Sequence, residues 1–588
     1  MSSAAATADE AHDEKDEKDK KKHPRDPARE VVETVVFVVV LVLLLKLFIT
    51  EAFVIPTGSM AETLYGYQKI ITCGKCSHQF PVNTHDEVEV NQNTKDKHFL
   101  VGYVCPNCRY QGDVTDLNPQ PENRTGDRVL VLKPLYHIRS PRRGDVVVFK
   151  YPMEPQKNHV AANYIKRAMG FGGETVAIYR GDLYVTMSLA YPDGELYPRP
   201  VDAHDLWKHE YMYSSGQASA QGQQLFGLSR EAGFTDRVPG GFRVVRKEED
   251  QLLADRRLVW DNDKQPRDLV GRVKPRWEEF GTAGRWNPDN RDQPRAFAHN
   301  GESIDWLRYQ HRTWKREKLT EEQLNRGEKP RLLPWRWPED SGEPVPGPVD
   351  NMLGYNSGTD WNKAQNRMNR RDDSGPESAL WVGDLILECE AEVAGGAEVV
   401  LELSRGPNRF QAKFGNGQVS LARVGPKGAE FGNPSRPCKV TNGKYKLRFA
   451  NVDCRLWVWV DGKRIDFGAE ADSDTAEATT TDADDHAKEG WVRENDIDQP
   501  AKIGAKGGVS VSAIKLHRDV YYTRNRGDQN VADVYYVQPG HFLCLGDNSA
   551  QSSDSRSWGT VPERLMLGKA VFVFWPGYPK PNRIGFIK

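Results

Sequence analysis

A long apolar run near the start of the chain constrains its folding more than any other feature of the sequence. The run VVETVVFVVVLVLLLKLFITEAFVIP starts at Val31, and from Val35 to Ile49 only Lys46 is charged. A helix of about 20 mostly apolar residues can cross a bilayer. We therefore expect a single transmembrane helix over 31–53. The alternatives are a cleaved signal peptide, although no A-x-A-like site follows the run, and a buried helix.

Charge in front of this run predicts its orientation. Residues 1–30 are charged and low in complexity, so we expect a disordered tail there. Seven basic residues between Lys15 and Arg29 precede the run. The positive-inside rule then leaves the N-terminus in the cytoplasm and everything after Ile49 outside. The chain of 588 residues has a net charge of −2, which gives no general attraction for nucleic acid.

Four of the eight cysteines form two close pairs with 28 residues between them. Each pair follows a strand-like run and lies in a turn that contains Gly or Pro, in ITCGKCSHQF and in VGYVCPNCRYQGDV. Four thiolates arranged in this way can close a tetrahedral zinc site. We therefore expect a zinc-ribbon-like insertion over 65–125. Two disulfides are the alternative, because disulfides persist outside the cytoplasm. The candidate ligands are Cys73, Cys76, Cys105 and Cys108.

The rest of the chain is typical of an antiparallel β protein. β-branched runs with Gly-Asp turns at 126–137, 141–152 and 163–185 predict consecutive strands. The stretch 186–378 is polar and rich in Trp and Arg, and its weak periodicity allows no assignment. From about 379 to 535, short alternating runs between Gly, Asn and Pro turns predict a β-sandwich.

The predicted sandwich has two further features. Its segments LRFANVDCRLWVWVDGKRIDF and IKLHRDVYYT resemble those of concanavalin-like and laminin-G-like jelly rolls, which implies a glycan or protein ligand. A spacer or packing domain without a ligand is the alternative. The acidic loop 468–490 interrupts the sandwich, and we expect it to be disordered.

Lys166 in NYIKRAMG is the first candidate for chemistry. In a strand it shares one face with Tyr164 and Ala168, while Ile165 and Arg167 lie on the other face. A lysine on an inner face is costly unless its charge is paired or lost, and burial lowers its pKa. A neutral lysine can take the proton of a serine hydroxyl. On this motif alone, an ordinary surface lysine is the simpler interpretation.

Five segments in order resemble the bacterial type I signal peptidases, the Ser-Lys leader peptidase family. They are the apolar run and the boxes IPTGSM, RRGDVVVFKYP, YIKRAMGFGGE and GDNSAQSSDSRSWGTVP. The resemblance covers roughly 31–64, 126–185 and 536–588, under a third of the chain. It implies a mainly β fold in which an antiparallel catalytic domain, formed by 54–64, 126–185 and 536–588, is split by the insertions.

Residue by residue, the resemblance implies that Ser59 is the nucleophile and Lys166 the general base. The backbone N–H of Ser59 and the hydroxyl of Thr57 would form the oxyanion hole. The other positions carried over are a serine that hydrogen-bonds the lysine, a structural ion pair and the lining of a small-residue pocket: Ser552, Asp554 with Arg556, and Ile55 with Pro56. The chain departs from the family pattern at Glu62, which replaces a proline, and at Ser549 and Ala550, which replace Arg and Asp.

The function implied by the resemblance is that of a membrane-bound serine endopeptidase. It would remove signal peptides from exported proteins at the outer face of the cytoplasmic membrane, as a single-pass protein with membrane lipid and signal peptides as its partners. No cofactor would take part in catalysis. One alternative is a catalytically impaired protein whose fold presents the sandwich to a glycan or protein. Another is a self-cleaving Ser-Lys regulator, against which the apolar run argues.

Overall fold

The structure is a computed structural model of the chain. Its contacts divide the chain into two compact units, Met1–Glu51 and Ala52–Lys588. Most of the tail 1–30 and of the acidic loop 468–490 lies outside the described residues. These are 27–89, 98–152, 162–189, 220–271, 273–281, 284–313, 315–316, 332–333, 344–363, 367–370, 380–425, 428–473, 492–524, 532–578 and 583–588.

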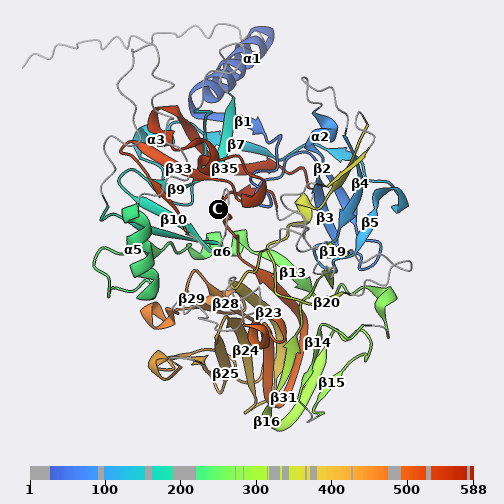
Figure 1. Cartoon of the computed structure of the whole chain (residues 1–588). Helices are drawn as coiled ribbons and strands as arrows, with labels where there is room; N and C mark the ends of the chain where they lie inside the picture. The colour runs from blue at the N-terminus through green and yellow to red at the C-terminus, as the bar shows by residue number, and fades with distance from the viewer. Residues whose placement is uncertain are drawn as a thin grey trace, which may run out of the picture. The chain divides into compact units, whose positions relative to one another are not determined.

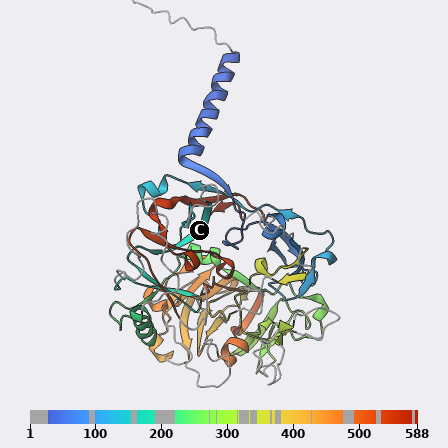
Figure 2. The ribbon, with the colours of Figure 1, turned by 45° about the horizontal axis from the view of Figure 1, so that its top comes forward.

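The first unit contains helix α1 (Pro27–Leu44), which continues into a π-helical turn (Leu45–Ile49) and forms one blue coil in Figure 2. In the part of the chain that the structure describes, no helix has both the length and the apolar character needed to cross a membrane. The transmembrane span predicted over 31–53 is therefore not confirmed. The helical run also ends earlier than predicted, because Thr50–Val54 forms strand β1 and pairs with a neighbouring strand.

An eight-stranded sheet in the second unit carries most of the boxes that resemble signal peptidases. Ser59 follows its edge strand β1, and Lys166 lies on β9. The hairpin β8–β9 is antiparallel, with Val147 opposite Lys166. After β1 the sheet continues with β7 (Arg128–Leu132), β35 (Met566–Trp575), β8 (Val146–Lys150), β9 (Asn163–Phe171), β33 (His541–Leu545) and β34 (Val561–Pro562), and β36 (Gly585–Phe586) pairs with β35.

A second, four-stranded sheet extends this body beyond the expected boundaries at 185 and 536. Helix α5 (Ala220–Glu231) packs against it through Phe226, whose ring meets those of Tyr179 and Tyr184 edge-on. Burial of these rings joins part of the 186–378 insertion to the body formed by the two sheets. The strands are β10 (Thr175–Tyr179), β11 (Asp182–Thr186), β12 (Arg243–Val244) and β32 (Asp533–Tyr536).

The cysteine-rich segment forms two small sheets. One of them includes strands from outside the range 65–125 that was expected for this segment. One sheet contains β2 (Gln68–Thr72), β3 (Gln79–Asn83) and β6 (Asn123–Arg124). The other contains β4 (His98–Val104) and β5 (Gln111–Asp113), together with β21 (Thr359–Asn362) and β22 (Arg367–Arg370) from the large insertion. The segment is completed by strands more than 200 positions away, which local sequence patterns could not predict.

The sandwich is larger than predicted and begins near residue 257 instead of 379. Its long strand β31 (Ala501–Arg518) pairs with strands from both parts of the insertion, and in Figure 1 it lies beside the green strands β14–β16. The earlier strands are β13 (Arg257–Asp261), β14 (Trp277–Phe280), β15 (Trp286–Pro288) and β16 (Phe297–Tyr309). The later strands are β23 (Leu385–Val393), β24 (Glu398–Arg405), β25 (Asn408–Gly415), β26 (Gln418–Val424), β27 (Ser435–Pro437), β28 (Gly443–Val452), β29 (Arg455–Val460) and β30 (Lys463–Ile465).

Short elements connect these bodies. Helix α6 (Glu249–Asp255) covers one face of the sandwich, where Leu252 packs with Trp457 and Trp459 and the Trp459 ring N–H donates to Glu249. The other short elements are α2 (His85–Val88), α3 (Leu135–Ile138), α8 (Ser555–Trp558), the 3-10 turn η5 (Gly354–Asn356) and the small pairs β17 (Arg312–Thr313) with β20 (Val345–Pro346) and β18 (Lys315–Arg316) with β19 (Leu332–Leu333).

Candidate active site

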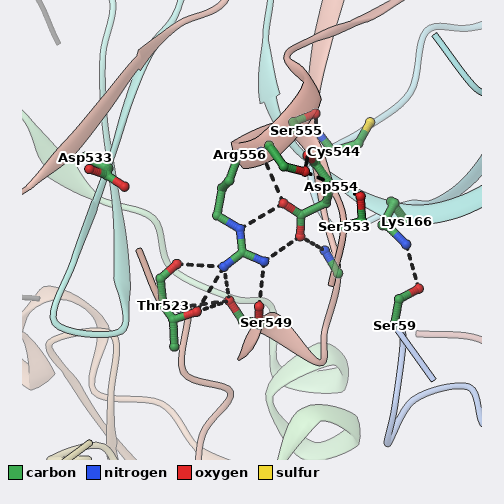
Figure 3. Close-up of polar contacts among 12 residues, drawn as sticks. Ser59, Lys166, Thr523, Asp533, Cys544, Ser549, Ser553, Asp554, Ser555 and Arg556 are labelled. Carbon is green, nitrogen blue, oxygen red and sulfur yellow. Dashed lines mark hydrogen bonds and ion pairs between the residues drawn. The ribbon is translucent and has the colours of Figure 1, made fainter. Parts of the chain in front are cut away.

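Ser59 and Lys166 lie side by side although 107 positions separate them in the chain. The Lys166 Nζ is 2.6 Å from the Ser59 Oγ in a hydrogen bond, as Figure 3 shows. Strand β9 turns Lys166 inward, and the side chain is 2% exposed, while Ser59 is 8% exposed. The nearest aromatic ring is that of Tyr164, two residues earlier on the same strand face, with its centroid 5.5 Å from Nζ. The two groups are therefore close enough for direct proton transfer.

Burial gives Lys166 an unusual acidity. Removal from water lowers the pKa of Lys166 from 10.5 to about 8, with the cation of Arg556 adding to the decrease and the carboxylate of Asp554 opposing it. Asp554 and Arg556 are ion-paired, and they shift the pKa of the amine in opposite directions. At pH 7 roughly one tenth of Lys166 is then neutral, far more than of an ordinary lysine, and only the neutral amine can accept a proton.

The turn that holds Ser59 is fixed by the core beneath it. Met60 is fully buried and packs with Ile55 and Leu64. Backbone hydrogen bonds from Ala61 N to Gly58 O (3.0 Å) and from Leu64 N to Met60 O (2.8 Å) close the turn. Ile55, expected to line a substrate pocket, lies with its side chain in this core.

The groups expected to form an oxyanion hole flank the serine. Within the described residues, neither the Ser59 backbone N–H nor the Thr57 hydroxyl has a hydrogen-bond acceptor. Thr57 and the neighbouring Pro56 are exposed. Both donors can therefore bind an oxygen of a ligand without first breaking a bond within the protein.

Asp554 and Arg556 form a buried, two-pronged ion pair. The Arg556 Nε is 2.8 Å from Asp554 Oδ1, and its terminal nitrogen is 2.6 Å from Oδ2. Asp554 also caps helix α8 and accepts a bond from Gly546 N. Arg556 in turn donates to the hydroxyl and carbonyl of Ser549, and to Thr523. The departure from the family pattern at Ser549 therefore places a hydroxyl where it binds this arginine (Figure 3).

Ser552 differs from its expected role. Its Oγ is buried and has no hydrogen-bond partner in the described structure, so the expected bond to Lys166 is not formed. The residue still lies beside the site, because a Cβ added at Gly546 would fall 2.1 Å from the Ser552 Oγ and 2.5 Å from the Ser59 carbonyl oxygen. Glycine at 546 is what allows this close approach.

Residues that were not expected from the sequence also hold the site together. Arg167, on the face of β9 opposite Lys166, is fully buried and binds both carboxylate oxygens of Asp547 at 2.8 and 2.6 Å. It also donates to Asp255 of α6, at 3.3 Å. Asn548 donates its backbone N–H to the Ser59 carbonyl at 3.1 Å. The GDN sequence of the last box was a usable signal for Asp547 and Asn548.

The four paired cysteines meet in one buried cluster. The Sγ atoms of Cys73 and Cys108 are 3.7 Å apart, and those of Cys76 and Cys105 are 3.6 Å apart. All four lie within 4.8 Å of one another and none is in a disulfide. Tetrahedral zinc–thiolate bonds of about 2.3 Å place sulfurs about 3.8 Å apart, whereas a disulfide requires about 2.05 Å. The donor set therefore fits zinc.

A serine hydroxyl bonded to a buried lysine on an antiparallel β framework is the arrangement expected of hydrolases that use a lysine as base. The sequence model of the family described as "Signal peptidase, peptidase S26" matches residues 111–233 and 457–575, which include Lys166 and the Asp554–Arg556 pair. The chain is 30% identical to signal peptidase I of Pseudomonas aeruginosa over 174 residues, 27% of this chain and 57% of that protein. The chain is thus similar to the type I signal peptidases over these segments.

Other relatives match shorter parts. Signal peptidase I of Pseudomonas fluorescens is 28% identical over 26% of this chain and 56% of its own length, and that of Aquifex aeolicus is 40% identical over 10% of this chain and 22% of its own. The chain thus spans little more than half the length of the two Pseudomonas relatives. Among solved structures, a carbohydrate-binding module from Bacillus subtilis is similar at 9% identity and a TM-score of 0.19, over 41% of this chain and 96% of that one. These values are too low to indicate a ligand.

We predict that replacing the buried amine of Lys166 by an apolar group makes the folded chain more stable. Because the pKa of Lys166 is lowered to about 8 in the folded chain, the unfolded chain binds this proton more tightly. The resulting cost of folding is fully present below pH 8 and disappears above about pH 10.5. Lys166→Met should therefore raise the free energy of unfolding by up to about 3 kcal/mol at pH 7, and the gain should shrink towards pH 10.

Denaturant unfolding at both pH values measures this gain. The control is Lys463→Met on strand β30, an exposed lysine whose replacement should change stability by less than about 0.5 kcal/mol. Equal stability of Lys166→Met and the wild type at pH 7 would contradict the account of a strained amine.

Proposed function

We propose that the chain is a membrane-anchored serine endopeptidase that removes signal peptides from exported preproteins. Ser59 is the nucleophile and Lys166 the general base. The observation that carries the proposal is the 2.6 Å bond between the Ser59 Oγ and the Lys166 Nζ in a buried environment that lowers the pKa of the lysine to about 8. The match to the signal peptidase family model and the relatives named signal peptidase I support the choice of signal peptides as substrate.

The geometry leads to a two-step reaction. Neutral Lys166 takes the proton of Ser59 as its Oγ attacks the scissile carbonyl, and the oxyanion receives hydrogen bonds from the Ser59 N–H and the Thr57 hydroxyl. The ammonium then gives its proton to the leaving amine, so that the peptide C–N bond breaks and an ester to Ser59 remains. In the second step neutral Lys166 takes a proton from a water that attacks the ester carbonyl. The Lys166 ammonium then gives this proton to the Ser59 Oγ as the C–O bond breaks, which releases the carboxylic acid product and restores the serine.

The apolar run supplies the anchor in this proposal. Its residues from Val35 to Ile49 contain one charge, and Ser59 comes only ten positions after Ile49. A signal peptide presents its cleavage site close to the bilayer, so a short connection between anchor and nucleophile suits this substrate. The basic residues before the run favour a cytoplasmic N-terminus and a catalytic body on the outer face of the cytoplasmic membrane.

The sandwich is best explained as a packing domain. Its face around Trp457 and Trp459 is covered by helix α6, and α6 also supplies Asp255 to the buried Arg167. A glycan could not reach the covered face without displacing this helix. The intact hydrogen bond between Ser59 and Lys166 argues against the alternative of a catalytically impaired protein that only presents the sandwich.

The four cysteines are proposed to hold one structural zinc ion. Their spacing fits tetrahedral thiolate ligation and supports zinc over the alternative of two disulfides. Asn107 donates to the Cys76 Sγ at 3.7 Å, as outer-shell groups around bound thiolates do. The chemistry at Ser59 makes no use of this ion. Cys73, Cys76, Cys105 and Cys108 would hold the two small sheets together.

Substitution of the dyad tests the proposed function. Ser59→Ala should abolish cleavage of a preprotein by the membrane-inserted chain. Lys166→Arg should do nearly the same, because arginine stays protonated and cannot act as a base. Thr57→Ala should be milder than either, since it removes one oxyanion donor, an effect of about 10²–10³ in rate, and leaves the backbone donor. Lys150→Arg on the neighbouring strand β8 is the matched control and should keep wild-type activity.

The pH profile tests the same base independently. Since only neutral Lys166 accepts a proton, kcat/KM should rise with pH and level off above about pH 8, the pKa to which burial lowers this lysine. Substantial cleavage by Lys166→Arg, or a rate that does not change between pH 6 and 9, would show that Lys166 is not the base.

Metal analysis tests the zinc proposal. The purified wild type should contain one zinc ion per chain, and Cys76→Ser should lose it and unfold at a lower temperature, because zinc binding contributes folding free energy. Cys438→Ser, at a half-buried cysteine of the sandwich, should keep the zinc. A chain that contains no zinc and shows two disulfides by thiol titration would reject the proposal.

A further inference from the structure

A short turn of the large insertion reaches the nucleophile. The 3-10 turn η5 (Gly354–Asn356) carries Tyr355 and Asn356, which are 1% and 2% exposed. The Tyr355 ring lies directly on Gly58, because a Cβ added at Gly58 would fall 2.1 Å from a ring carbon. Its hydroxyl donates to the Tyr67 carbonyl at 3.1 Å. The inserted segment thus forms one wall of the serine turn.

Asn356 makes a reciprocal pair of hydrogen bonds with Asn548 of the last box. The Asn356 Nδ2 donates to Asn548 Oδ1 at 2.6 Å, and the Asn548 Nδ2 donates to Asn356 Oδ1 at 2.8 Å. Both side chains are at most 2% exposed. This pairing fixes the plane of the Asn548 amide, and the bond from its Nδ2 to the Gly58 carbonyl identifies the donor end.

The donor end of Asn548 points to the serine turn. Its Nδ2 also donates to the Gly58 carbonyl at 2.9 Å, and its backbone N–H donates to the Ser59 carbonyl at 3.1 Å. The Gly58 carbonyl and the Ser59 N–H belong to one planar peptide unit and point in opposite directions. Holding the carbonyl therefore sets the direction of the N–H, which is the backbone donor to the oxyanion.

The turn η5 is itself held by the cysteine-rich segment. A side chain at Gly354 would collide with Pro106 and Phe80, and the Ser357 hydroxyl accepts a bond from Val104 N at 3.2 Å. Strand β21, which follows η5, pairs with β4. The turn that carries Asn356 is thus held by contacts with the cysteine-rich segment. These contacts do not involve the strand that precedes Ser59 or the strand that carries Lys166.

We infer that Asn356 is a positioning residue for the oxyanion donor: through Asn548 it aims the Ser59 N–H, and the large insertion thereby becomes part of the catalytic apparatus. The inference rests on the proposed function. An oxyanion donor is worth about 10²–10³ in rate. If the Ser59 N–H points in the wrong direction, part of this rate contribution is lost. Binding of the substrate changes little, because the ground state depends less on the donor than the transition state does.

Asn356→Ala in the full-length chain tests the inference with a preprotein substrate. We expect kcat to fall about 10- to 100-fold, which is less than or equal to the rate loss expected when an oxyanion donor is removed. KM should change little. The pH at which the rate levels off should stay where it is, because Lys166 is untouched. Asn351→Ala is the matched control: it removes an asparagine of the same inserted segment, whose side chain accepts a bond from Leu380 N at 2.8 Å, and should keep the wild-type kcat.

Three results would overturn the inference. One is an unchanged kcat in Asn356→Ala. The second is an equal loss in both variants with equally lowered melting temperatures, which would mean general destabilisation. The third is a shifted pH profile, which would place the effect on Lys166.

A wild type that does not cleave preproteins would refute the proposed function instead. Hydrogen exchange of the peptide covering 53–64 then decides the inference by itself. Faster exchange in Asn356→Ala but not in Asn351→Ala supports it, and identical exchange in the two variants refutes it.

Discussion

The amine of Lys166 is buried beside a single serine hydroxyl, and the rest of the site depends on this arrangement. A charged lysine in such a place is costly, and the chain meets the cost by lowering the pKa of the amine to about 8. Burial is the largest cause of this decrease, and the two members of the Asp554–Arg556 pair shift the pKa of the lysine in opposite directions. Stability is thus traded for a base whose neutral fraction near physiological pH is far larger than that of an ordinary lysine.

The site is assembled from segments that lie far apart in the chain. The serine turn follows β1, the lysine comes from β9, and the ion pair and Asn548 come from the last box. Asn356 comes from an insertion that lies between the two segments matched by the family model. The insertion and the sandwich are therefore integrated into the catalytic body: α6 covers the sandwich on one side and supplies Asp255 to Arg167 on the other. This burial is difficult to reconcile with a sandwich that acts only as an appended binding module.

The short motifs in the sequence predicted the proximity of Ser59 and Lys166, the inward face of β9 and the meeting of the cysteine pairs, because each depends on local patterns or on a known order of boxes. The start of the sandwich was not predictable in the same way. Strand β16 is interrupted by a register shift between Gly301 and Asp305, which breaks the two-residue alternation that identifies strands. Asn356 carried no local signal at all, since its partner Asn548 is 192 positions away. The role of Ser552 was expected from the family, but its hydroxyl makes no hydrogen bond to the lysine in the described structure.

The most direct test of the central claim is a titration of Lys166 itself. In the full-length chain labelled with 13C at the lysine side chains, the Lys166 resonance can be assigned as the one missing in Lys166→Arg, and its chemical shift followed from pH 6 to 11. The account predicts a midpoint of about 8, because burial removes the amine from water. A midpoint near the ordinary lysine value of about 10.4 would contradict it, since the amine would then be charged at neutral pH and could not serve as the base for Ser59.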